Sequence, residues 1–155
     1  MIYIIVALKA EAQAFVDKYK LKEYKNNDIK VVISGMGADA TLQTTTKILQ
    51  KISKNDIILN VGICGASKNY AIGQLIDARY EQITCIDYEA TDTKYDIVDM
   101  ESAGFIKATK DVKNSFIFNV VSDHFEPKTV SKDMAKKLIF NQIDEIMKRV
   151  KGCKE

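Results

Sequence analysis

Arginine is scarce in this chain: only Arg79 and Arg149 among its 23 basic residues are arginines. Proteins that grip phosphate groups through paired hydrogen bonds mostly use arginine. The basic residues nearly balance the 21 acidic ones, and the formal net charge is +2. Partners such as nucleic acid or an anionic membrane favour a stronger positive charge. The composition therefore argues against both as main partners, and against extensive phosphate recognition.

Cysteine and histidine are also rare. Cys64, Cys85 and Cys153 lack the spacing of a metal site. Their odd number favours reduced thiols and a cytoplasmic location. His124, the only histidine, has neither a serine elbow nor a second ligand that would indicate a catalytic triad or a metal centre. We therefore expect neither a metal nor a cofactor.

The chain has no apolar run long enough to cross a membrane. The run at residues 1–8 is too short to span a bilayer. It also lacks the basic start and the cleavage site of a signal peptide. Its β-branched residues predict a buried strand instead. With 155 residues, 46% of them hydrophobic and 28% charged, residues 1–155 are expected to form a single globular domain.

Strand and helix patterns alternate along the chain. Strands are predicted at residues 2–8, 29–34, 56–61, 73–78, 82–87, 95–98 and 115–121. Helices are predicted at residues 9–20, 38–51 and 100–110. A last helix follows Pro127, starts near Ser131, and keeps an apolar stripe as far as Val150. This alternation predicts an α/β fold with three layers, α/β/α, around a central mixed, mostly parallel sheet.

Polar residues cluster after several of these strands, where open α/β sheets bind their ligands. Three acids, a serine and two glycine turns occupy such positions: Glu11, Glu101, Asp123, Ser122, residues 34–37 and residues 62–65. Each has an ordinary structural explanation as a first-turn acid, a cap or a turn. Their joint occurrence predicts a functional site at one edge of the sheet.

Six segments resemble, in the same order, the nucleoside phosphorylase and nucleosidase superfamily. They are Ala7-Leu-Lys-Ala-Glu11, Ser34-Gly-Met-Gly37, Asn60-Val-Gly-Ile-Cys-Gly-Ala66, Ile72-Gly-Gln-Leu-Ile-Asp77, Val98-Asp-Met-Glu-Ser-Ala-Gly104 and Val121-Ser-Asp-His124. The opening segment is most similar to the methylthioadenosine/S-adenosylhomocysteine nucleosidases. The resemblance implies the fold of this superfamily, hydrolysis of the N-glycosidic bond of a purine-type nucleoside, and a homodimer or larger homo-oligomer.

The resemblance also implies a role for each acid. Asp123 would protonate the departing purine, and Ser122 would orient Asp123. Glu11 would activate the attacking water. Glu101 would accept hydrogen bonds from the ribose hydroxyls, while Met100 would pack against the ribose.

Further positions complete the implied site. One side of the site would hold the sugar and the attacking water or phosphate. The residues that line this side would be Ser34, Gly35, Gly37, Gly62 and Gly65. The base pocket would include Phe125, Ile63 and Cys64.

Two substitutions favour water over phosphate as the nucleophile. The similar phosphorylase segment has arginine and serine where this chain has Asn60 and Ile63. Their loss should cost several kcal/mol of phosphate binding, at about 1.5–3 kcal/mol for each charged hydrogen bond. A hydrolase is the favoured interpretation, and a phosphate-dependent phosphorylase is the alternative.

The chain also departs from the nucleosidases. Asn119 occupies the position at which they carry an arginine near the water. Only residues 78–97 occupy the place of the long segment with which they bind the base. The resemblance is therefore to a shortened form, in which Tyr80, Tyr88 or Tyr95 could supply the missing stack on the base. A catalytically degenerate nucleoside-binding protein and an unrelated flavodoxin-like domain remain alternatives.

Overall fold

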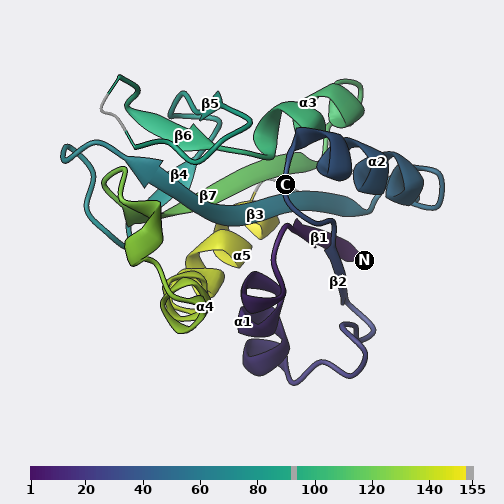
Figure 1. The fold of residues 1–155 in the computed structure, drawn as a ribbon. Helices are drawn as coiled ribbons and strands as arrows, with labels where there is room; N and C mark the ends of the chain where they lie inside the picture. The colour runs from purple at the N-terminus through teal and green to yellow at the C-terminus, as the bar shows by residue number, and fades with distance from the viewer. Residues whose placement is uncertain (92–93, 153–155) are drawn as a thin grey trace.

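The computed structural model describes residues 1–91 and 94–152, in which helices cover both faces of a central sheet (Figure 1). Four parallel strands form its core: β2 (Ile29–Ile33), β1 (Ile2–Val6), β3 (Ile57–Ala66) and β7 (Ser115–Asp123). The short strand β4 (Leu75–Asp77) adds to β7 in the antiparallel direction. Cys153, one of the expected free thiols, lies outside the described residues.

The far end of β3 carries a second, smaller part of the sheet. β1 pairs with β3 only as far as Asn60, so the same edge of β3 is open beyond that point. β6 (Ile97–Asp99) takes this place and runs antiparallel to residues Gly65 and Ala66. β5 (Thr84–Cys85) then pairs in parallel with β6. The sheet is mixed for this reason.

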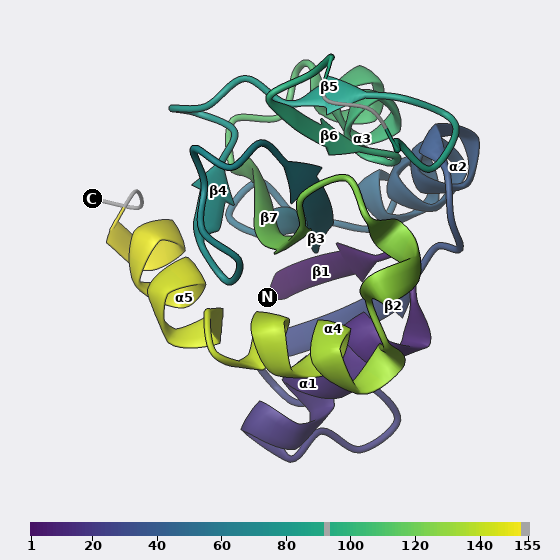
Figure 2. The same ribbon diagram turned by 60° about the vertical axis from the view of Figure 1, so that its left-hand side comes forward.

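Two helical layers pack on the two faces of the sheet. α1 (Lys9–Tyr19), α4 (Lys132–Phe140) and α5 (Ile143–Gly152) cover one face, and α2 (Ala38–Leu49) and α3 (Ser102–Thr109) cover the other (Figure 2). Alternate strand residues face each layer: Leu59 belongs to the core beneath α1, and Ile58 to the core beneath α2. Strands buried on both faces in this way need continuous apolar runs, as the sequence has.

The strands predicted at 2–8, 73–78 and 82–87 are shorter than expected, and two other predicted elements differ more. The third strand does not end at its glycines but continues to Ala66, because β7 and β6 pair with this stretch. The predicted last helix is two helices, with a break at Asn141 and Gln142. Gln142 turns away to donate a hydrogen bond to the Gly73 carbonyl, at 2.7 Å. The apolar stripe survives the break because both helices pack against the same core.

The start of α4 agrees with the sequence: Ser131 is the N-cap, and its hydroxyl accepts the Met134 N–H. Over the described residues, no helix combines the length and apolar character that crossing a membrane requires.

Candidate active site

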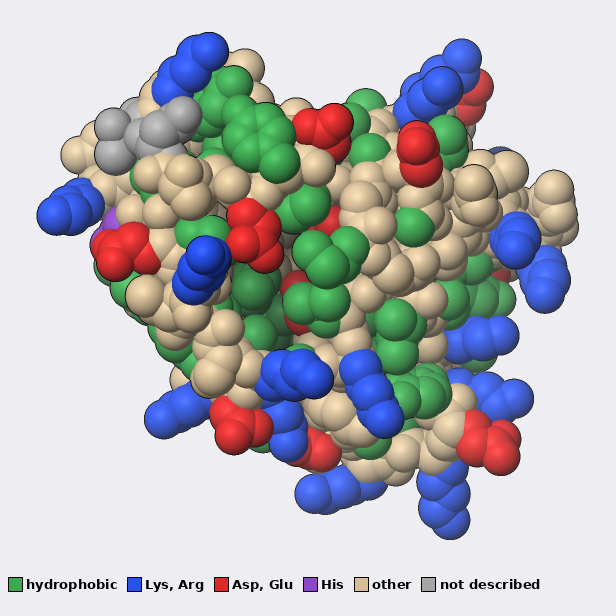
Figure 3. Space-filling model, in the orientation of Figure 1, with side chains coloured by type: hydrophobic (Ala, Val, Ile, Leu, Met, Phe, Trp, Pro, Cys, Tyr) green, Lys and Arg blue, Asp and Glu red, His purple; other side chains and the backbone are tan. Residues whose placement is uncertain are grey.

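A cavity of about 680 Å³ lies at the carboxyl ends of β1 and β7. Its walls come from the first turns of α1 and α4, the end of β3, the segment between β5 and β6, and the start of α3. In the space-filling view this face is hollowed, with acidic side chains among the apolar ones around the hollow (Figure 3). The cavity therefore draws on segments from across the whole chain.

Glu11 lies in the first turn of α1, and only 2% of it is exposed. Its Oε1 accepts the backbone N–H groups of Ala7 (3.1 Å) and Leu8 (2.8 Å), and its Oε2 accepts that of Ile63 (3.0 Å). Burial raises the pKa of Glu11 to about 7, and repulsion from Glu101 adds to this, although the backbone hydrogen bonds oppose it. A carboxylate with this pKa is suited to accept a proton near neutral pH.

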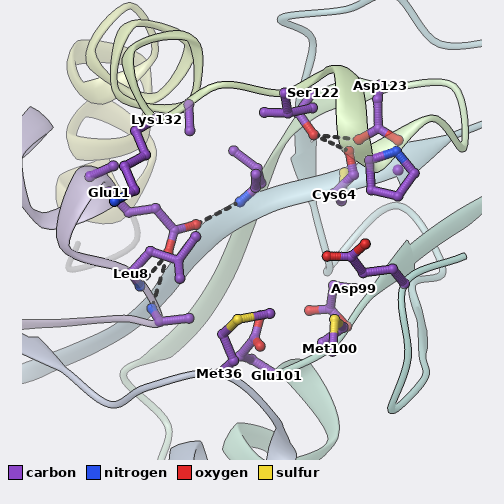
Figure 4. A pocket seen from close by; sticks show the side chains of 18 of the residues that line it. Leu8, Glu11, Met36, Cys64, Asp99, Met100, Glu101, Ser122, Asp123 and Lys132 are labelled. Carbon is purple, nitrogen blue, oxygen red and sulfur yellow. Dashed lines mark hydrogen bonds between the residues drawn. The ribbon is translucent and has the colours of Figure 1, made fainter.

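Glu101 lies just before α3, on the opposite wall from Glu11 (Figure 4). Its Oε2 accepts the N–H of Gly37 at 2.8 Å. Gly37 has a φ of +100°, a conformation that glycine adopts readily, and this presents the N–H to the carboxylate. Burial also raises the pKa of Glu101, and the charge of Asp99 contributes, while the Gly37 N–H lowers it.

A second glycine allows this contact between α2 and α3. A Cβ on Gly104 would lie only 1.9 Å from the carbonyl oxygen of Ala38, the first residue of α2. Glycine at this position therefore lets α3 approach the start of α2 closely. The Gly37 turn and Glu101 are held together as a result.

Asp123 ends β7 and is buried. The Ser122 hydroxyl oxygen is 2.7 Å from its Oδ1, and the Glu126 N–H donates to its Oδ2 at 2.8 Å. The same hydroxyl is 3.2 Å from the Cys64 carbonyl oxygen. Asp123 is thus held at the cavity wall by groups on both sides of it in sequence.

The structure brings most of the predicted site residues to this one cavity. Those that line it are Glu11, Glu101, Asp123, Ser122, Met100, Ile63, Cys64 and Gly65. Figure 4 shows the acids on facing walls around a common space. Glu11 and Asp123 on opposite ends of the sheet would favour the flavodoxin-like alternative, whereas the structure places both in this cavity.

Five predicted residues do not line the cavity: Ser34, Gly35, Gly37, Gly62 and Phe125. The Ser34 hydroxyl donates within its own loop, to the Gly35 carbonyl at 2.7 Å. Met36, from the same turn, faces the cavity instead. Phe125 is buried in a cluster with Val98 and Ala90, of which only those two line the cavity. Phe125 therefore packs against wall residues without lining the cavity itself.

Comparison with known proteins rests on structure alone, since no family model and no curated protein matches the chain. A 5'-methylthioadenosine/S-adenosylhomocysteine nucleosidase from Neisseria meningitidis, in complex with methylthio-immucillin-A, superposes with a TM-score of 0.73 at 14% identity, over 96% of this chain and 98% of that one. The Helicobacter pylori nucleosidase with butyl-thio-DADMe-Immucillin-A gives 0.70 at 15% identity, over 93% and 97%. Futalosine hydrolase of Helicobacter pylori gives 0.69 at 15% identity, over 93% and 97%.

This is the nucleosidase fold. The predicted fold class, a three-layer α/β/α domain with a mixed, mostly parallel sheet, is confirmed by these matches. In this nucleosidase fold the cavity lies where the sequence placed it, at the carboxyl edge of the parallel strands.

The segment between β5 and β6 settles which tyrosine reaches the cavity of the nucleosidase fold. Tyr88 lines it, next to Ile86. Tyr80 is 74% exposed and stacks against Arg79 instead. Tyr95 does not line the cavity and packs on the cluster of Phe125, Val98 and Ala90.

Sequence reasoning missed other wall residues. The N-cap and the first five residues of α4 contribute Ser131, Lys132, Asp133, Ala135 and Lys136. The sequence does not predict that these residues line the cavity, because this depends on how α4 packs across it in the folded chain. Asp99 lies inside one of the six similar segments, but as a strand-end acid it carries no sequence signal of a role. Among the described residues, no cluster of His, Cys, Asp and Glu side chains is arranged to hold a metal ion.

Both arginines lie away from the cavity. Arg79 and Arg149 contact the Asp77 carboxylate at 2.7 and 3.4 Å, and Arg149 also pairs with Glu145 at 3.1 Å. None of these four residues lines the cavity. The two permanent guanidinium charges are thus used to join β4 to α5.

Proposed function

We propose that the protein is an N-ribosyl hydrolase that cleaves the N-glycosidic bond of a purine-type nucleoside. The observation that carries this proposal is the meeting of Glu11, Glu101 and Asp123 in one cavity of a nucleosidase fold. Cleavage of such a bond needs an acid for the leaving group and a base for the water. The cavity supplies a candidate for each.

In the proposed reaction, protonated Asp123 donates its proton to a ring nitrogen of the purine as the bond to the sugar breaks. Glu11 takes a proton from water, and the water oxygen forms the new bond to the anomeric carbon. Glu101 accepts hydrogen bonds from the ribose hydroxyls. Because the transition state resembles an oxocarbenium ion, nearby carboxylates also stabilise its positive charge. The products are the free base and the free sugar.

Three features favour water as the nucleophile. Glu11 occupies the N–H groups of Ala7, Leu8 and Ile63, which an anion would otherwise bind. Its ionised form would repel a phosphate dianion. Asn60, in the place of the phosphorylase arginine, donates to the Ile5 carbonyl at 3.3 Å.

A second candidate function, phosphorolysis, rests on lysines in the cavity wall. Lys9 and Lys132 line the cavity from the first turns of α1 and α4. Both are exposed. The dependence of base release on phosphate decides between the two reactions.

The base side of the cavity is proposed to use Tyr88 as its stacking residue. Tyr88 and Ile86 face the cavity from the segment between β5 and β6. Cys64 lines the same cavity. Aromatic rings and apolar side chains suit the flat face of a purine.

The substrate is proposed to be a 5'-thio-substituted nucleoside such as methylthioadenosine. Two of the matched nucleosidases were solved with thio-substituted immucillins. The futalosine hydrolase match extends the panel of substrates to futalosine. On the resemblance in sequence, we also propose that the enzyme works in the cytoplasm as a homodimer.

The test is release of free base from methylthioadenosine, S-adenosylhomocysteine, adenosine, inosine and futalosine, with and without phosphate. We expect release without phosphate. Asp123→Asn should lower kcat by about 10²–10⁴-fold, the usual contribution of a general acid. Asp111→Asn, at an exposed position outside the cavity, is the matched control. Tight binding without any product would instead support the degenerate binding protein.

A further inference from the structure

Asp99 is a buried carboxylate at the cavity that the proposed reaction does not use. It ends β6, lines the cavity, and is only 5% exposed. No ion pair links it to a lysine or arginine among the described residues. A buried charge without a cation must be stabilised by hydrogen bonds.

Neutral donors supply these bonds. The Ser102 hydroxyl donates to Oδ1 at 2.6 Å, and the Ser102 N–H donates to Oδ2 at 3.1 Å. The side-chain amide of Asn119 donates to Oδ2 at 3.3 Å. Both oxygens of Asp99 are therefore engaged, and each bond is strengthened by the charge.

These bonds close the turn that carries Met100 and Glu101. A side-chain oxygen that accepts the N–H three residues later fixes a turn in the way that an N-cap residue does. Asp99 is joined to Ser102 across this turn, so the position of Glu101 depends on it. The Gly37 N–H holds the far end of the Glu101 side chain.

The third bond ties the same turn to β7. Asn119 is buried in the middle of that strand, on which Asp123 lies four residues later. One carboxylate thus joins the segment that carries Glu101 to the strand that carries Asp123.

We propose that Asp99 is a positioning residue that sets Glu101 against the ribose hydroxyls, and that it thereby determines selection of ribonucleosides over deoxyribonucleosides. This proposal rests on the proposed function, in which Glu101 contacts the ribose. A carboxylate distinguishes the 2'-hydroxyl of ribose from the hydrogen of deoxyribose only when it is held in place. A mobile carboxylate would form its hydrogen bonds with water instead.

Asparagine at this position replaces aspartate only in part. Asp99→Asn keeps the size of the side chain but removes its charge and turns one acceptor oxygen into a donor. The oxygen that remains can still accept the Ser102 and Asn119 N–H groups, and the Ser102 hydroxyl can turn to accept from the new amide. All three bonds lose the contribution of the charge, so the turn is held less firmly.

The test compares kcat/KM for adenosine with kcat/KM for 2'-deoxyadenosine. We expect the wild type to prefer adenosine, and Asp99→Asn to reduce this preference by about tenfold, the value of one hydrogen bond to a charged group. Glu101→Gln should reduce it too. The double variant should show no further reduction beyond Glu101→Gln, because Asp99 acts through Glu101.

Asp77→Asn is the matched control, since Asp77 is an equally buried carboxylate outside the cavity. It should lower stability and leave the preference unchanged. If Asp99→Asn does not fold, Ser102→Ala should reduce the preference in the same direction by a smaller factor. An unchanged preference in the folded variant, or additive effects in the double variant, would overturn the proposal.

Failure of the proposed function would be visible separately. If the wild type releases no base, the same comparison is made with the dissociation constants of the two nucleosides, measured by calorimetry. A preference for adenosine that Asp99→Asn reduces would support the proposal for a binding protein. Equal binding of both nucleosides by the wild type, or no binding of either, would overturn it.

Discussion

Two buried carboxylates, Asp77 and Glu11, are stabilised in opposite ways. Asp77 is 3% exposed and Glu11 is 2% exposed. Arg79 and Arg149 contact Asp77, whereas Glu11 accepts only backbone N–H groups. Burial raises the pKa of Asp77, but the bonds and charge of the arginines outweigh it, and the net pKa is lowered. Burial of Glu11 is not outweighed, and its pKa rises to about 7.

This difference separates a structural carboxylate from one suited to proton transfer. Guanidinium partners keep Asp77 ionised, so it serves as a constant link between β4 and α5. Backbone N–H groups fix the position of Glu11 but leave its charge free to change near neutral pH. The scarce arginines of the chain thus stabilise the fold, while the cavity relies on dipoles of the backbone.

The largest effect is expected from removal of the structural carboxylate. Asp77→Ala removes the buried carboxylate that Arg79 and Arg149 share, which should lower the free energy of unfolding by about 3–5 kcal/mol even though Arg149 keeps its ion pair with Glu145. Chemical denaturation at pH 7 measures this. Asp56→Ala, which removes an ion pair with the N-terminus, should cost less than about 1 kcal/mol.

A comparable loss in the two variants would show that Asp77 is not a buried link. The lowered pKa of Asp77 also determines how its contribution to stability depends on pH. Because the folded-state pKa of Asp77 lies below its usual value of 3.8, its stabilisation is complete above that value. It is lost as the pH falls through the folded-state pKa.

Glu11 should affect stability in the opposite direction. Its pKa is about 7 in the folded protein against its usual value of 4.5, so the folded state binds the proton more tightly. Its contribution to stability is therefore full below pH 4.5 and falls as the pH rises to 7. The total change is about 3 kcal/mol, at 1.36 kcal/mol for each pKa unit.

Glu11→Gln isolates this change, because glutamine cannot ionise. The difference in unfolding free energy between wild type and variant should shift by about 3 kcal/mol in favour of the variant between pH 4.5 and pH 8. Denaturation curves across this range measure it, with Glu23→Gln at an exposed position as the control. A pH-independent difference would mean that Glu11 titrates normally and is not poised as a base.

The meeting of Glu11 and Asp123 could be predicted from sequence because it follows from simple geometry. Glu11 and Asp123 follow or end parallel strands with continuous apolar runs, and such strands end at the same edge. Glu101 reaches this edge by another route. β6 runs antiparallel to the end of β3 and so leads its last residues back to the cavity.

Long-range packing could not be predicted. The two-residue break between α4 and α5 leaves the apolar period intact, so the pattern alone gives one long helix. The wall formed by Lys132 and its neighbours depends on where α4 crosses the cavity. Asp99 looked like an ordinary strand-end acid, since its partner Asn119 is 20 residues away in sequence.

A smaller effect on stability than that of Asp77→Ala is expected from a single methyl group beside Glu11. Gly62 lies in β3 with no positive φ, so alanine fits its backbone. A Cβ there would lie 3.2 Å from Oε2 of Glu11 and 3.3 Å from Oδ1 of Asn119. Such tight contacts should cost about 1–2 kcal/mol of unfolding free energy.

Gly62→Ala should nevertheless reduce base release strongly, because Glu11 is fixed by its backbone hydrogen bonds and can move only by breaking one of them. We expect kcat to fall at least about tenfold, as for the loss of one charged hydrogen bond. Gly152→Ala, where a Cβ meets nothing within 4 Å, is the control for the methyl group. Equal activity of Gly62→Ala and wild type would show that the exact position of the Glu11 carboxylate does not matter, and the contrast with Asp77 would then reduce to charge alone.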